Sequence, residues 1–181
     1  MIFAWASPTE RLEALLEGHC RAFAWLGGVP HECIFDNAKT VITKILAGPA
    51  REEHTLFASL RAHYLFDSLF CRPGEAHEKG TVENGVGYVR RNALVPVPEL
   101  PDWEALIAHL LAWCERERRR RWEAWEQERA ALRSLPDRPF RAARPHVVTV
   151  NKLSLVTFDR NRYSVRMGRP HADPVGLYGP D

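Results

Sequence analysis

The sequence feature that most constrains the fold of this chain is segment 79–92, which has a helical period but contains glycines. One apolar stripe at that period consists of Val82, Val86, Val89 and Ala93. The neighbouring stripe consists of Lys79, Glu83, Gly87 and Arg90. Gly85 and Gly87 each cost a helix about 1 kcal/mol relative to alanine, so helix stability alone does not explain them. The segment is therefore either a surface helix with a solvated charge row, or a helix that presents Glu83 to a bulky ligand over Gly87.

The stretch before this helix supplies a second acid in a position typical of α/β sites. Residues 31–36 predict a short strand that ends at Asp36, and open α/β sheets bind ligands at the carboxyl ends of their strands. The 46 residues between Asp36 and Glu83 leave room for one helix and one strand. We therefore expect an α/β fold in which these two carboxylates converge.

A series of short motifs runs through the chain in a recognisable order. They are Gly27-Gly28-Val29-Pro30, Ile34-Phe35-Asp36-Asn37-Ala38-Lys39-Thr40, His63-Tyr64, Cys71-Arg72-Pro73, Lys79-Gly80-Thr81-Val82-Glu83 and Tyr88-Val89-Arg90-Arg91-Asn92. Together they resemble the core of insertion-sequence transposases of the IstA type, over roughly residues 1–165. Those proteins carry a retroviral-integrase-like catalytic domain with a ribonuclease H-like fold in three layers.

The resemblance implies a DDE-type site for metal-dependent phosphoryl transfer on DNA. Asp36 corresponds to the second acid of the triad and Glu83 to the third, and both would be catalytic residues and ligands of Mg²⁺ or Mn²⁺. The family's first acid lies on an earlier strand, and the glutamates before Asp36 are poor substitutes for it. The resemblance thus implies an N-terminally truncated transposase with an incomplete core, weak metal binding and no strand cleavage by itself. A sheet without that strand would also expose an edge that invites self-association.

Composition and charge fit a soluble globular protein with a local basic surface. The chain has 45% hydrophobic and 27% charged residues and a net charge of +2. It has no apolar run of membrane-spanning length, and its first residues lack the cationic segment and apolar core expected of a signal peptide. Its four cysteines form no CxxC pair, so we expect reduced thiols in the cytoplasm. Residues 116–144 contain ten Arg against four Glu and one Asp. This run is either a phosphate-binding surface or a solvated helix face with Glu–Arg pairs.

The predicted DNA contacts combine this run with residues near the predicted site. They are Lys39, Lys79, Arg90, Arg91, Arg118, Arg119, Arg120 and Arg121. Trp122 and Trp125 lie one turn apart, and we expect them to be packing residues rather than base-stacking ones.

Four regions are expected along the chain. They are an integrase-like core at 1–95, a basic helical linker at 96–145, a partial small β-barrel at 146–167 and a disordered tail at 168–181. Within the core the sequence predicts a strand at 1–6, a helix at 8–26 capped by Ser7, irregular chain at 37–50, a helix at 52–63 and a strand at 66–71. Asp102 should cap the next helix, and short strands are predicted at 147–150, 153–158 and 163–165.

The expected function is DNA transposition or integration. The alternatives are a non-catalytic DNA-binding or assembly module and a structure-selective nuclease of the ribonuclease H-like fold. The expected partners are transposon-end and target DNA and further copies of the full-length protein, and the family implies an IstB-type helper ATPase.

Overall fold

The computed structural model describes residues 1–35, 41–45, 51–71, 76–143, 148–158 and 160–165, with the backbone alone at 43–45, 51–52 and 76–84. The chain divides into two compact units, Met1–Ala142 and Ala143–Asp181. Mixed α/β architecture in the first unit confirms the expected class. The ribonuclease H-like fold and the four-region division remain predictions.

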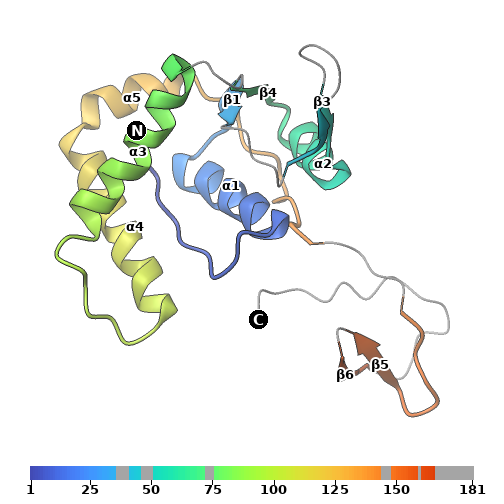
Figure 1. Cartoon of the computed structure of the whole chain (residues 1–181). Helices are drawn as coiled ribbons and strands as arrows, with labels where there is room; N and C mark the ends of the chain where they lie inside the picture. Colours follow the sequence, from blue (N-terminus) through green and yellow to red (C-terminus); the bar gives the residue numbers. More distant parts are fainter. Residues whose placement is uncertain (36–40, 46–50, 72–75, 144–147, 159, 166–181) are drawn as a thin grey trace. The chain divides into compact units, whose positions relative to one another are not determined.

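A parallel pair of strands forms part of the first unit (Figure 1). Strand β1 (Glu32–Phe35) pairs in register with β4 (Asp67–Phe70), so that Ile34 faces Leu69 across the pair. The outward side chains on this pair are uncovered, since Ile34 is 58% exposed and Leu69 is 49% exposed. Two helices precede these strands: α1 (Leu12–Leu26) before β1, and α2 (Thr55–Tyr64) before β4.

A β-hairpin occupies part of the segment that the sequence predicts to be irregular. Strand β2 (Ile42–Ile45) pairs antiparallel with β3 (Arg51–Glu53). The prediction for 37–50 is wrong at these residues because isoleucine and threonine favour the extended backbone. Helix α2 accordingly starts later than expected, after His54, whose Nδ1 accepts a hydrogen bond from the Leu56 amide at 3.1 Å.

The described part of the first unit contains three further helices. Helix α3 (Ala76–Ala93) includes the whole of segment 79–92, which confirms the predicted helix. Helix α4 (Trp103–Arg120) begins at the predicted cap, where Asp102 Oδ1 accepts a hydrogen bond from the Ala105 amide at 2.8 Å. Helix α5 (Trp122–Ala130) follows directly after a break at Arg121.

Two hydrophobic clusters hold these elements together. The first consists of Leu12, Leu16, Cys20, Phe23, Val29, Phe35, Val41, Phe57, Leu60, Tyr64 and Phe66. It joins α1 and α2 to the inward face of the parallel strands, and its aromatic rings meet edge to face, as Phe35 and Phe57 do at 5.1 Å between centroids. The second cluster has Ala93, Leu110, Trp113 and Cys114 at its centre. It joins α3 to α4.

The N-terminal segment is not the strand that the sequence predicts at residues 1–6. Residues 1–6 form no strand, but every second side chain still points inward, because Ile2, Ala4 and Ala6 pack on the second cluster. Helix α1 begins at Leu12 rather than at residue 8, and its N-cap Arg11 makes no side-chain capping bond. The predicted end of this helix is confirmed, since Gly27 adopts φ 70° as its C-cap.

The second unit contains an antiparallel hairpin of β5 (Leu155–Phe158) and β6 (Asn161–Ser164). Strand β6 begins at Asn161, inside the stretch 159–162 that the sequence assigns to the turn, and it ends before Val165. The strand predicted at 147–150 is absent from 148–150, and residue 147 lies outside the described residues. The barrel remains a prediction, and the tail from 168 onwards also lies outside the described part of the chain.

Candidate functional site at the carboxyl end of the parallel strands

The carboxyl ends of β1 and β4 lie side by side. The Cys71 amide, directly after β4, donates a hydrogen bond to the carbonyl oxygen of Phe35 at 2.9 Å, and Phe35 is the last residue of β1. Asp36 is the next residue along the chain, and α3 starts a few residues after Cys71. The segments that carry the two predicted acids therefore leave the sheet from the same edge.

Part of the predicted site falls outside what the structure describes. Asp36 and Lys39 lie in the undescribed segment 36–40. Lys79 and Glu83 belong to α3, but only their backbone is described. The convergence of the two carboxylates therefore remains a prediction.

The described part of α3 corrects one expectation about its glycines. A β-carbon placed on Gly87 would lie 3.0 Å from Nη1 of Arg91, so the space expected to be open over this glycine is covered by a guanidinium. Around Gly85 nothing lies within 4 Å of such a β-carbon. Arg90 and Arg91 are both exposed at the end of this helix, where a cation also interacts favourably with the helix dipole.

A buried carboxylate fastens α3 to α4. Glu117 is only 5% exposed, and its Oε2 accepts a hydrogen bond from the Tyr88 hydroxyl at 3.0 Å. Its Oε1 accepts a second bond from Arg120 Nη1 at 2.9 Å. His109 adds a second link between the two helices, since its Nε2 donates to the carbonyl of Ala93 at 2.7 Å. These bonds fix the helix that carries Glu83.

The role of Glu117 is not evident from the sequence, because a glutamate in an arginine-rich run has the pattern of a solvated residue. A signal was present, since Leu110, Cys114 and Glu117 recur at the helical period of the buried face of α4.

The four consecutive arginines at 118–121 have different surroundings. The Arg118 guanidinium contacts two indole rings, 4.9 Å from the centroid of Trp25 and 5.9 Å from that of Trp125. It also pairs with Glu115 at 2.5 Å. Arg121 lies 6.0 Å from a tyrosine ring, that of Tyr88. Some of these arginines therefore make contacts within the protein, and the role of the run in binding DNA remains a prediction.

Arg119 is exposed and differs from the other three arginines in having no partner among the described residues. The two tryptophans that follow also differ from each other. Trp125 is buried at 3% exposure, as expected for a packing residue, whereas Trp122 is 48% exposed, contrary to expectation.

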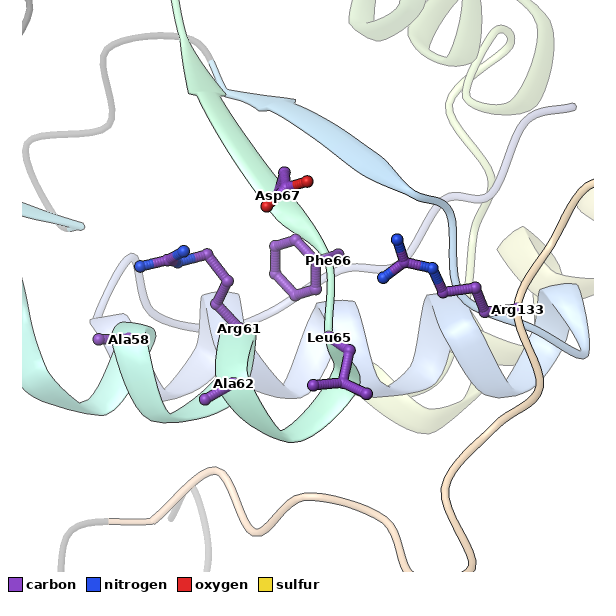
Figure 2. A pocket seen from close by; sticks show the side chains of 7 residues that line it. All are labelled: Ala58, Arg61, Ala62, Leu65, Phe66, Asp67 and Arg133. Atoms are coloured by element: carbon purple, nitrogen blue, oxygen red, sulfur yellow. The ribbon is translucent and has the colours of Figure 1, made fainter.

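A hollow of about 390 Å³ lies at the opposite end of β4 from the predicted acids (Figure 2). It is lined by Ala58, Arg61, Ala62, Leu65, Phe66, Asp67 and Arg133. In Figure 2, Arg61 and Arg133 flank Phe66 from either side. Arg61 pairs with Glu53 at 3.2 Å. Because Asp67 begins β4, this hollow is at the amino end of the strands and is not part of the predicted site.

Two titratable groups in and beside the first hydrophobic cluster, Cys33 and Tyr64, have raised pKa values. Burial, and secondarily the charge of Glu32, raise the pKa of the Cys33 thiol to about 11, so it is not a thiolate at neutral pH. Burial also raises the pKa of Tyr64 to about 12. The described residues contain no cluster of three or more His, Cys, Asp or Glu side chains that could hold a metal ion. None of the helices, as far as they are described, is long and apolar enough to span a membrane.

Comparison with known proteins confirms the resemblance to insertion-sequence transposases. No family model matches the chain. A transposase from Aminobacter aminovorans is 34% identical over 166 residues, which are 84% of this chain and 32% of that protein. The transposase for insertion sequences IS1326/IS1353 from Pseudomonas aeruginosa is 32% identical over 169 residues, 86% of this chain and 32% of the relative.

A third relative names the same kind of element. The transposase for insertion sequence element IS21 from Pseudomonas aeruginosa is 31% identical over 170 residues, which are 89% of this chain and 43% of that protein. By sequence, the chain is therefore related to the transposases of insertion sequences, and it spans about a third of the length of the first two relatives.

Proposed function

We propose that this chain contributes Asp36 and Glu83 to metal-dependent phosphoryl transfer on DNA, as part of a transposase with a ribonuclease H-like core. The observation that supports this most is the common edge at which β1 ends before Asp36 and β4 leads into α3. Open α/β sheets place their ligands at such an edge. The relationship to insertion-sequence transposases supplies the class of reaction.

The donor atoms of the two proposed ligands would suit a hard divalent cation. Two carboxylates from Asp36 and Glu83 are oxygen ligands of the kind that Mg²⁺ and Mn²⁺ take. Such ions would activate the attacking hydroxyl and stabilise charge on the phosphate. The contribution of the chain itself is positioning. Strand β1 holds Phe35, the residue directly before Asp36, by its pairing with β4, and the Tyr88–Glu117 bond fixes α3. Arg90 and Arg91 would contact DNA phosphates.

Two carboxylates do not complete a two-metal site, because such a site holds both the attacking and the leaving oxygen. The matched segment is about a third of the first two relatives, so further ligands would come from another part of the transposase. We therefore expect the 181-residue chain to bind Mn²⁺ weakly and to give no strand transfer alone. The full-length protein would work as a homo-oligomer on transposon ends and target DNA, together with an IstB-type ATPase.

Two experiments test the proposal. The first is Mn²⁺ binding to the chain, followed by electron paramagnetic resonance, for Asp36→Asn and Glu83→Gln. Each variant should weaken binding, whereas Glu32→Gln, at the far end of β1, should not. The second grafts this chain in place of the matching segment of the Aminobacter aminovorans transposase. Transposition by the chimera that survives both Asp36→Asn and Glu83→Gln would remove these acids from the mechanism.

The second candidate function, a DNA-binding module without catalysis, is favoured by the exposed arginines of α4. Arg116 and Arg119 are solvent-exposed and have no described carboxylate partner. Phosphate binding through such residues would be salt-dependent and tolerant of sequence. If the chain binds duplex DNA but no variant at Asp36 or Glu83 affects the chimera, this candidate replaces the first.

A further inference from the structure

A second hollow, of about 400 Å³, lies between the end of α1 and helix α5, and the proposed reaction does not use it. Its lining includes three tryptophans and three arginines, namely Trp25, Trp122, Trp125, Arg118, Arg129 and Arg133, and no acidic residue. Its volume falls in the range of small-ligand sites, which is about 300–1,000 Å³.

The walls of this hollow are held in place by close backbone contacts. The Val29 amide and the Arg133 carbonyl form one hydrogen bond at 2.9 Å, and the Arg133 amide and the Val29 carbonyl form another at 2.9 Å. Gly28 permits this approach, because a β-carbon there would lie 2.7 Å from Cβ of Leu132. On the other side, Trp125 is buried and packs near Trp25, with 6.1 Å between ring centroids. The site is therefore preformed.

Its polar groups include cations that nothing described neutralises. The charge of Arg118 is balanced by Glu115. Arg129 is exposed and has no described carboxylate partner. Arg133 donates from Nε to Nδ1 of His31 at 3.0 Å, and that partner is a neutral acceptor in this contact. Two cations thus remain available beside an exposed indole, that of Trp122.

We infer that this hollow binds one unstacked nucleotide of single-stranded DNA, with its base on the Trp122 indole and its phosphate on Arg129 and Arg133. An exposed aromatic face beside paired cations matches the two ends of a nucleotide, and base–aromatic stacking contributes about 1–3 kcal/mol. A protein partner fits less well, since the centre of a protein interface is depleted in charge. A base in an intact duplex is not accessible for such stacking. This inference rests on the proposed function, because it gives the transposase a site for unpaired DNA.

The test is fluorescence anisotropy with labelled DNA at low salt. The probes are a thymidine oligonucleotide of about eight nucleotides, an abasic oligonucleotide of the same length, and a blunt duplex. Trp122→Ala should weaken binding of the thymidine strand by about 5- to 150-fold and leave the abasic strand unchanged. Trp122→Phe should retain most of the affinity, because it keeps an aromatic face. The matched control Trp103→Ala removes an exposed tryptophan outside the hollow and should have no effect.

The cationic half is tested in the same titration. Arg129→Gln should weaken binding of both single strands and reduce the slope of log affinity against log salt by about 0.7. Arg116 lies outside the hollow, so Arg116→Gln should leave the ratio of affinities for the thymidine and abasic strands unchanged. Equal affinity for thymidine and abasic strands overturns the inference, as does full displacement of the strand by polyglutamate. If the duplex binds but the single strands do not, the inference fails and the proposed function stands. If no form of DNA binds, both fail.

Discussion

Replacing Gly28 by alanine should destabilise the first unit more than any other glycine-to-alanine change in its described part. The added β-carbon would lie 2.7 Å from Cβ of Leu132 and 2.8 Å from the carbonyl oxygen of Arg133. Neither atom belongs to a flexible side-chain end, so the segment after α5 must move away. That movement would break the two hydrogen bonds that join Arg133 to Val29.

The magnitude follows from the two ways in which the clash can be relieved. Overpacking that is accommodated by small shifts costs about 1–3 kcal/mol. Loss of two backbone hydrogen bonds costs about 1–3 kcal/mol in net terms. Because one relief replaces the other, the terms are not added. We expect a loss at the upper end of these ranges, about 2–3 kcal/mol, because two of the contacts are shorter than 3.0 Å. For a chain of this size that lowers the melting temperature by roughly 4–12 °C.

Two other glycines provide matched controls with different expected results. Gly27 has φ 70° but no atom within 4 Å of an added β-carbon, so alanine there meets only backbone strain of about 1–2 kcal/mol. Gly85 lies in α3 with open space around it, so alanine there should stabilise the helix by about 0.5–1 kcal/mol.

The assay is urea unfolding followed by tryptophan fluorescence, with hydrogen exchange at the amides of Val29 and Arg133. Gly28→Ala should increase exchange at both amides, and Gly27→Ala should affect them less. If Gly28→Ala is no more destabilising than Gly27→Ala, or if the two amides keep their protection, the close approach of the two segments is refuted.

Three further predictions concern the packed polar groups. Tyr88→Phe should lower the free energy of unfolding by about 1–3 kcal/mol, because it removes the hydroxyl that bonds the buried Glu117 carboxylate; an unchanged urea midpoint would disprove this link between α3 and α4. Arg118→Ala should lose about 1–2 kcal/mol in thermal unfolding through its two indole contacts, whereas exposed Arg119→Ala should stay within about 0.5 kcal/mol of wild type, and equal effects would contradict the assignment. Burial lowers the pKa of His19 below its ordinary 6.5. Below pH 6.5 the unfolded chain therefore binds more protons at His19 than the folded chain does, and the free energy of unfolding falls as the pH falls. His19→Gln should flatten this pH dependence, and an unchanged slope in urea unfolding at several pH values would rule out a contribution from His19.

Local patterns predicted the helices better than the strands. The period of 79–92, Asp102 as a cap and Gly27 as a stop are all local signals, and each appears in the structure. Strands depend on partners that are distant in sequence. Residues 1–6 alternate like a strand yet form none, since their alternate side chains pack on helices instead. The β2–β3 hairpin was missed because its glycine and proline at 48–49 suggested irregular chain.

The sequence predicts the candidate site only as far as the edge of the sheet on which it lies. A strand-end acid and a helix acid predict convergence at the carboxyl end of the strands, and β1 and β4 do end together there. The environment of the arginines could not be predicted in the same way. Whether Arg118 faces DNA or two indoles depends on how α1 packs against α4 and α5, and no periodic pattern encodes that packing.

The paired hydrogen bonds between Val29 and Arg133 also have a kinetic consequence. They join residues separated by about a hundred positions, and closing so long a loop is entropically unfavourable before the intervening chain is compact. We expect this contact to form after the folding transition state, when α1 and α5 are already in place. Gly28→Ala should therefore accelerate unfolding in stopped-flow measurements and leave the folding rate nearly unchanged.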